Sequence, residues 1–152
     1  MKSLGMVLLL VGMTAGANSN LGRTIDKWES TGKPKNIYTW YRSGNRNIKH
    51  GWDVFYFENG QMARKYAWVK GKLQGPYQSW YADGAVREQG KYVAGVLHGP
   101  WQTLHANGSK SRVCTYYAGK IEGGLKEWYA DGQLRKTGAW VKGKAHGAFE
   151  QF

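Results

Sequence analysis

The stretch GPYQSWYADG (75–84) decides the fold, because it returns 48 residues later as GGLKEWYADG (123–132). Glycines carry the underlying period of 24 residues along the chain. They form three ladders: Gly51, Gly75, Gly99, Gly123 and Gly147; Gly60, Gly84, Gly108 and Gly132; and Gly71, Gly95, Gly119 and Gly143. A repeat of this length is one supersecondary unit, which buries its apolar surface only by stacking on its neighbours.

An Asn or Asp precedes every glycine of the second ladder: Asn59, Asp83, Asn107 and Asp131. Asn-Gly and Asp-Gly are the strongest short hairpin signals, so we expect tight type I′ turns at these four positions. A second, looser turn is expected between the third and first ladders, as in 71–75. Each unit is then strand, tight turn, strand, looser turn. From Gly51 onward no glycine-free stretch exceeds ten residues, which leaves no room for a long helix.

Aromatic residues recur at fixed positions of the repeat. One set consists of Trp68, Tyr92, Tyr116 and Trp140, and another of Tyr56, Trp80, Leu104, Trp128 and Phe152. Stacked hairpins would bring each set together across neighbouring strands, where aromatic pairs stabilise a sheet. We therefore predict an all-β, elongated antiparallel meander of 24-residue β-hairpin repeats with roughly ten to twelve strands. Residues 28–152 hold five repeats plus a C-terminal fragment, after a lead-in at 18–27.

The first 17 residues have the pattern of a secretory signal peptide. Lys2 precedes a ten-residue apolar run, 4–13, and Ala15-Gly16-Ala17 presents small residues where signal peptidase cleaves. The run is shorter than the roughly 20 residues that a membrane-spanning helix needs. The alternative is a buried N-terminal helix. Cleavage near Ala17 predicts a protein of the periplasm, the envelope or the extracellular space, without a transmembrane segment in the mature chain.

The repeat resembles the MORN repeat family, in the variant form found in bacterial YwqK-family antitoxin-type proteins. The resemblance rests on 75–84 and 123–132, with Tyr92-Val93-Ala94-Gly95 and Trp140-Val141-Lys142-Gly143 after them. It covers about residues 28–152 and implies one hairpin per repeat and a role as scaffold, binding platform or antitoxin. The third full repeat departs from the pattern at Leu104-His105 and Lys110, which indicates either looser packing or a surface that faces a partner.

The chain shows no pattern of catalytic or metal-binding chemistry, so we expect no enzymatic activity, no cofactor and no metal site. One cysteine excludes a disulfide framework and a cysteine-based zinc site. His50, His98 and His146 occupy one repeat position but lie two repeats apart, roughly 19 Å at ~4.8 Å per strand, and are expected to be turn residues. Cys114 stands in register with Gly90 and Gly138. It either fills a small site in the sheet or links two chains.

Charge gives the strongest indication of a partner. The chain has 22 Lys and Arg against 10 Asp and Glu, a net charge of +12. The candidate binding residues are Arg87, Lys91, Arg135 and Lys136 as one lengthwise basic band, with Trp80, Tyr81 and His105 as an alternative aromatic surface. A solvated sheet face that resists edge association is the plain alternative.

These observations favour an exported binding or scaffold module for a protein or an anionic envelope component, either lipid or glycan. Export disfavours nucleic acid as a partner. The other function compatible with the pattern is an antitoxin or immunity protein that neutralises a toxin by direct binding.

Overall fold

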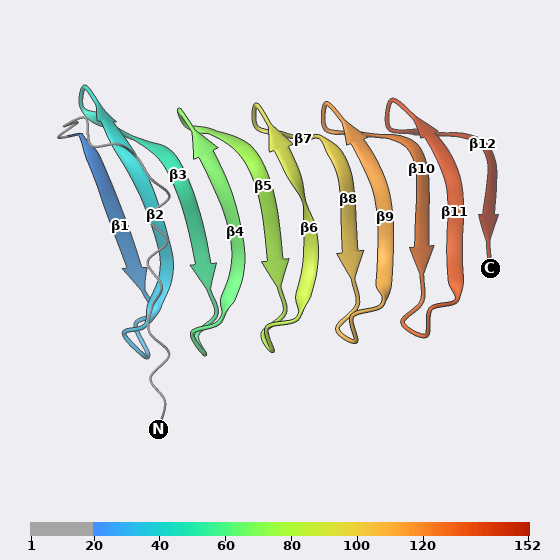
Figure 1. The fold of residues 1–152 in the computed structure, drawn as a ribbon, viewed down its shortest axis with the longest axis horizontal. Helices are drawn as coiled ribbons and strands as arrows, with labels where there is room; N and C mark the ends of the chain where they lie inside the picture. Colours follow the sequence, from blue (N-terminus) through green and yellow to red (C-terminus); the bar gives the residue numbers. More distant parts are fainter. Residues whose placement is uncertain (1–19) are drawn as a thin grey trace.

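Residues 20–152 form one open antiparallel sheet of twelve strands. The computed structural model describes residues 20–152. The strands are β1 (Leu21–Lys27), β2 (Pro34–Ser43), β3 (Arg46–Tyr56), β4 (Met62–Val69), β5 (Lys72–Trp80), β6 (Val86–Val93), β7 (Val96–Leu97), β8 (Gly99–Leu104), β9 (Lys110–Tyr117), β10 (Lys120–Trp128), β11 (Leu134–Val141) and β12 (Lys144–Gln151). They lie side by side in chain order, except that the short β7 and then β8 both pair with β6 (Figure 1). The predicted meander is confirmed, and so is its number of strands.

The N-terminal lead-in that the sequence analysis placed before the repeats contributes a strand to this sheet. Residues 21–27 form β1, which pairs with β2 from Leu21↔Tyr41 to Lys27↔Pro34. The signal-peptide prediction falls on residues 1–17, which lie outside the described residues. Within 20–152 no helix is long and apolar enough to cross a bilayer.

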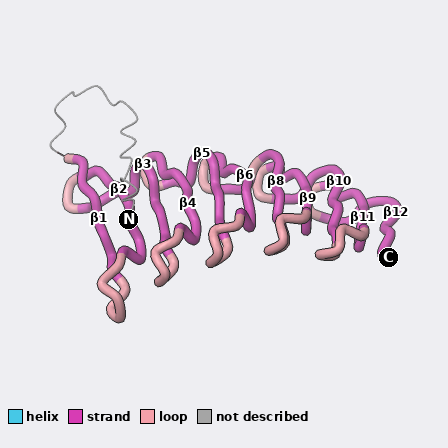
Figure 2. Tube along the Cα trace, turned by 60° about the horizontal axis from the view of Figure 1, so that its bottom comes forward, coloured by secondary structure: helices cyan, strands magenta, loops and turns pink. Residues whose placement is uncertain are grey.

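Turns of one kind gather along each long edge of the sheet. The loops that contain Asn-Gly or Asp-Gly lie along one edge, and the loops that contain Lys-Gly or Ala-Gly lie along the other (Figures 1 and 2). Both edges are therefore periodic, and equivalent side chains of successive repeats stand in rows across the strands.

The assignment of type I′ turns to the Asn-Gly and Asp-Gly positions is wrong. Gly84 has φ +93°, but Asp83 is not in the positive-φ region that a type I′ turn requires at both central residues. The Gly84 amide donates to the Tyr81 carbonyl at 3.0 Å, and the Tyr81 amide donates to Ala85 at 2.8 Å. This is a three-residue loop, in which the Asp83 carboxylate accepts from the Ala85 amide at 2.9 Å. Asn59, Asn107 and Asp131 repeat that Asx contact.

The two-residue turns with positive φ at both centres lie at the opposite edge. Lys70, Ala94, Ala118 and Lys142 have φ of 48°, 50°, 47° and 52°, and each precedes a positive-φ glycine. At some of these turns, a side chain from the preceding repeat accepts a hydrogen bond from the amide of the positive-φ residue. The Ala94 amide donates to Gln74 Oε1 at 2.8 Å, and the Lys142 amide donates to Glu122 Oε2 at 2.7 Å. These contacts, which have no local sequence signal, offset part of the cost of the left-handed backbone.

The core is thin and lies on β8, β9 and β10, in the C-terminal half of the array. Trp101, Cys114 and Leu125 are 8%, 2% and 1% exposed, and half-buried aromatic residues pack around them. All three belong to strands of the third and fourth repeats. The departure at Leu104-His105 therefore does not loosen the packing of this part of the sheet.

Candidate binding groove and the predicted site residues

Alternation along the strands gives the sheet two unlike faces. Tyr77 and Trp101 share one face, where their rings stack with centroids 5.1 Å apart, and Tyr92 and Tyr116 meet Trp101 edge-on. We call this the aromatic face. Glu88 belongs to it, since its carboxylate accepts from Trp101 Nε1 at 3.1 Å and from the Tyr77 hydroxyl at 3.3 Å. The set at 68, 92, 116 and 140 lies here, but the stacking runs through Tyr77 and Trp101, which the sequence analysis did not single out.

The opposite face carries a groove of about 460 Å³. We call this side the groove face. Its lining consists of Trp52, Lys65, Pro76, Tyr77, Gln78, Gln89, Gly90, Pro100, Trp101, Gln102 and Val113. Tyr77, Gly90 and Trp101 alternate with their neighbours and lie in the floor. Gln78, Gln89 and Gln102 pair directly across β5, β6 and β8, so their side chains form a row. Sequence reasoning missed this groove, because glutamine at these positions breaks no repeat rule.

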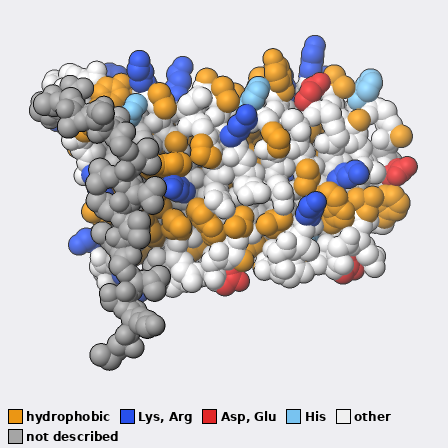
Figure 3. Space-filling model, in the orientation of Figure 1, with side chains coloured by type: hydrophobic (Ala, Val, Ile, Leu, Met, Phe, Trp, Pro, Cys, Tyr) orange, Lys and Arg blue, Asp and Glu red, His pale blue; other side chains and the backbone are white. Residues whose placement is uncertain are grey.

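A lysine and an indole close one end of the row. Lys65 Nζ lies 3.9 Å from the centroid of the Trp52 ring, which fits a cation–π contact, and Trp52 remains 41% exposed. Figure 3 shows how hydrophobic side chains reach the surface of one side of the sheet among scattered lysine and arginine residues. Because the sheet is a single layer, a ligand can contact these exposed aromatic rings and basic side chains without a conformational change of the protein.

The four predicted basic residues do not form one band. Arg87 and Arg135 are exposed and stand at equivalent bulges, where the β5–β6 and β10–β11 registers skip them. Lys91 is exposed and pairs with Pro76 beside the groove. Lys136 is half-buried on the aromatic face, where it pairs with Glu127 and its Nζ lies 5.8 Å from the centroid of the Trp140 ring. Strand alternation therefore separates Lys136 from Lys91.

The predicted aromatic surface holds repeats together. The Tyr81 hydroxyl donates to the Leu104 carbonyl at 2.8 Å, and His105 Nε2 lies 2.9 Å from the Trp128 carbonyl oxygen. Tyr129 repeats the contact with Phe152 at 3.2 Å. Each bond joins one loop to the end of a strand in the next repeat. His105 thus replaces tyrosine in function as well as in position. Trp80, which precedes Tyr81, is half-buried opposite Val86.

We expect His105→Phe to lower the free energy of unfolding by about 0.5–1.5 kcal/mol, the net value of one hydrogen bond. His105→Tyr restores the donor of the neighbouring repeats and should stay close to the parent. Urea denaturation of both variants measures the difference. Equal stability of the two would contradict an inter-repeat bond at this position.

Burial shifts the titration of the aromatic face. The pKa values of Tyr66, Tyr77, Tyr92 and Tyr116 are raised above 10.0, first of all by desolvation. Desolvation likewise raises the pKa of the Cys114 thiol above 9.0. This keeps Cys114 protonated and unreactive at neutral pH. Its burial agrees with a residue that fills a small site rather than one that links two chains.

These shifts predict loss of stability at alkaline pH. The unfolded chain releases the tyrosine protons near pH 10.0, whereas the folded chain holds them to higher pH. Stability should therefore be unaffected by these groups below about pH 9 and fall as pH rises past 10. Thermal melts from pH 7 to 11 follow the effect. Tyr92→Phe removes one of these groups and should flatten the fall, while an unchanged slope would refute the role of Tyr92.

The histidines at the turn edge have structural contacts. His50 Nδ1 accepts from the Lys70 amide at 3.4 Å, the same repeat contact that Gln74 and Glu122 make, and its ring meets Tyr41 edge-on. His98 packs against Tyr117 with centroids 5.3 Å apart. In residues 20–152 no three His, Cys, Asp or Glu side chains converge in a way that could hold a metal ion.

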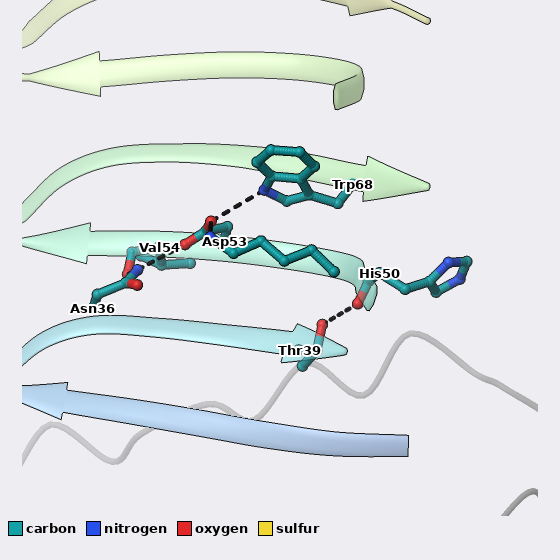
Figure 4. A network of polar contacts seen from close by, with 7 residues as sticks. Asn36, Thr39, His50, Asp53, Val54 and Trp68 are labelled. Carbon is teal, nitrogen blue, oxygen red and sulfur yellow. Dashed lines mark hydrogen bonds and ion pairs between the residues drawn. The ribbon is translucent and has the colours of Figure 1, made fainter. Parts of the chain in front are cut away.

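A buried carboxylate stands at the N-terminal side of the sheet. Asp53 is 0% exposed, and its oxygens accept from Asn36 Nδ2 and Lys49 Nζ, both at 2.7 Å, and from Trp68 Nε1 at 3.1 Å (Figure 4). In the same view, the Thr39 hydroxyl donates to the His50 carbonyl. Asn36 lies on β2 and Trp68 on β4, while Lys49 lies on β3 with Asp53 itself, so this cluster ties β2, β3 and β4 together.

Comparison with known proteins agrees with the repeat and goes no further. The family model described as MORN repeat variant matches residues 73–94, which span β5, its turn and β6. No curated protein matches the chain. Among solved structures, the chain is similar to "Crystal structure of GtfA/B complex bound to UDP and GlcNAc" with 10% identity and a TM-score of 0.30. The match covers 87% of this chain and only 29% of that one, and at this TM-score nothing about function follows.

Proposed function

We propose that the protein is an exported, non-enzymatic binding module that holds a protein or an anionic envelope component against the groove face of its sheet. The groove is the observation that carries the proposal. It places an exposed indole, a lysine and a row of three amides on one open surface. The MORN repeat variant at 73–94 supports a binding or scaffold role.

The chemistry of the lining favours binding over catalysis. Among the described residues that line the groove, Lys65 and Tyr77 are the only titratable ones. The Tyr77 hydroxyl is held on the aromatic face by Glu88. Acid–base catalysis needs paired groups with matched pKa values within reach of one substrate, and this lining does not offer such a pair.

The test is capture of envelope material by the immobilised full mature chain. A groove variant, Gln78→Ala with Gln89→Ala and Gln102→Ala, is compared with a basic variant, Arg87→Gln with Lys91→Gln and Arg135→Gln. We expect the groove variant to lose capture and the basic variant to weaken it chiefly at low salt. Capture that neither variant alters would overturn the proposal. A stoichiometric complex with a toxin encoded by a neighbouring gene would instead favour the antitoxin function.

Export has its own test. Mass spectrometry of the protein recovered outside the cytoplasm should show an N-terminus at Asn18, because the small residues at 15 and 17 suit signal peptidase. Recovery of the chain with Met1 intact would count against export by this route.

A further inference from the structure

The glutamine row is a set of side-chain amides without a hydrogen-bond partner among residues 20–152. Gln78, Gln89 and Gln102 stand on three adjacent strands about 4.8 Å apart, so the row spans roughly 10 Å. Their amides form no hydrogen bond with another residue of the described chain. Each amide offers two donors and an acceptor. A ligand that satisfies the row must itself present both donors and acceptors at short, regular intervals.

The row is local, which distinguishes it from a general property of the repeat. The residues equivalent to Gln78 and Gln102 in the flanking repeats are Val54 and Lys126, and Gln89 is replaced by Lys65 and Val113. The amides are therefore confined to the middle of the sheet, inside the groove.

Flat apolar surfaces border the amides. Pro76 and Pro100 are exposed on the groove face, and the Trp52 ring stands at one end with Lys65 packed against it. A planar ring and proline rings present C–H and π surfaces without any pocket that encloses a side chain. Such surfaces suit a flat, rigid ring whose edge carries polar groups.

The charge of the groove lining restricts the class of ligand further. Within the described part of the chain, the lining holds one cation, Lys65, and no acidic residue. A nucleic acid or another polyanion would meet a single positive charge where several are needed to neutralise its phosphates. An extended peptide is recognised on a sheet mainly through the backbone of an edge strand and through pockets for its side chains, whereas this groove lies across a sheet face. An uncharged polyhydroxyl chain fits both the amides and the flat surfaces.

We propose that the groove binds an uncharged oligosaccharide whose chain crosses β5, β6 and β8, with a sugar ring on Trp52 and hydroxyl groups on the three glutamine amides. This inference rests on the proposed binding function of the groove but assigns it a different ligand from the anionic envelope component, because Lys65 is the only cation among the described residues of the lining. Because sugar hydroxyls donate and accept in turn, each amide can exchange one hydrogen bond in each direction with the same sugar unit.

The experiment is isothermal titration of the full mature chain with three soluble hexasaccharides built from glucose, mannose or N-acetylglucosamine. We expect heat of binding with at least one of them and little change of affinity between low and high salt, since no ion pair is involved. Trp52→Ala and Gln89→Ala should each lower the affinity by about tenfold, because each removes a central contact.

Matched variants outside the groove control for exposure and residue type. Tyr117→Ala removes an aromatic residue that is 65% exposed, and Gln133→Ala removes an exposed glutamine in a turn; both should bind as the parent does. Circular dichroism and melting verify that each variant is folded. No binding to any hexasaccharide, or binding that Trp52→Ala and Gln89→Ala leave unchanged, overturns the inference. If the groove variant loses envelope capture while the parent binds no sugar, the binding function stands and the sugar assignment falls. Groove-dependent binding of a proline-rich peptide in the same titration would assign the site to a protein partner.

Discussion

Replacing Gly90 by alanine is expected to destabilise the protein by about 1–3 kcal/mol, the usual cost of forcing an extra group into a packed core. A Cβ at this position would lie 2.1 Å from Cε3 of the Trp101 ring and 2.7 Å from Cζ3. The ring has little freedom to move, because it stacks on Tyr77 and meets the edges of Tyr92 and Tyr116. Equilibrium urea denaturation measures the loss.

Two controls separate this clash from a general effect of alanine. At Gly124 no atom lies within 4 Å of the added Cβ, so Gly124→Ala should leave stability nearly unchanged. Residues 90 and 101 have equivalents one repeat later in Cys114 and Leu125, which pair directly and are both buried. Gly90→Ala with Trp101→Leu imitates that pair and should cost less than the sum of the two single changes. An additive result would show that the indole does not cover Gly90.

The period of glycines was sufficient to predict the sheet. A 24-residue repeat with glycine at fixed positions allows little other than stacked hairpins, and the register of the structure follows it. The type of each turn was not predictable from the dipeptides. Asn-Gly suits a type I′ turn, but the Asx side chain also accepts from the backbone two residues on, and this second preference decides the loop at Asp83. Lys70 then occupies the left-handed region, against its own preference, because the two-residue turn matches the strand twist.

Side-chain direction divides the predicted site residues in a way that the sequence did not show. Arg135 and Lys136 are adjacent, and a bulge and strand alternation place them in different surroundings. The sequence suggests that Tyr81 and His105 are surface aromatic residues, yet the polar atom of each side chain forms a hydrogen bond with a backbone carbonyl of the next repeat. Such contacts join residues 23 apart and have no signature within one repeat. The groove could not be predicted either, because its three glutamines are distant in the sequence and only the strand register brings them together.

Asp53 departs from its repeat, and this departure predicts the second large effect. The equivalent positions hold Tyr77, Trp101 and Leu125, all on the aromatic face. The Asp53 carboxylate is fully buried and accepts hydrogen bonds from three side chains. Asp53→Ala leaves Trp68 Nε1 without its acceptor and leaves Asn36 Nδ2 with the Val54 carbonyl alone, and we expect a loss of about 2–4 kcal/mol.

Comparison with Lys49 shows which part of the cluster matters. The Lys49 side chain is 33% exposed, so its ammonium reaches water when Asp53 is removed, and in Lys49→Met the carboxylate keeps two donors. Lys49→Met should therefore cost clearly less than Asp53→Ala. Because the donors lie on β2 and β4 as well as β3, we also expect amide hydrogen exchange to accelerate in all three strands in Asp53→Ala, but not at the distant β10 and β11. A stability within about 0.5 kcal/mol of the parent, the range of an ordinary surface change, would mean that the cluster does not hold the first repeats together.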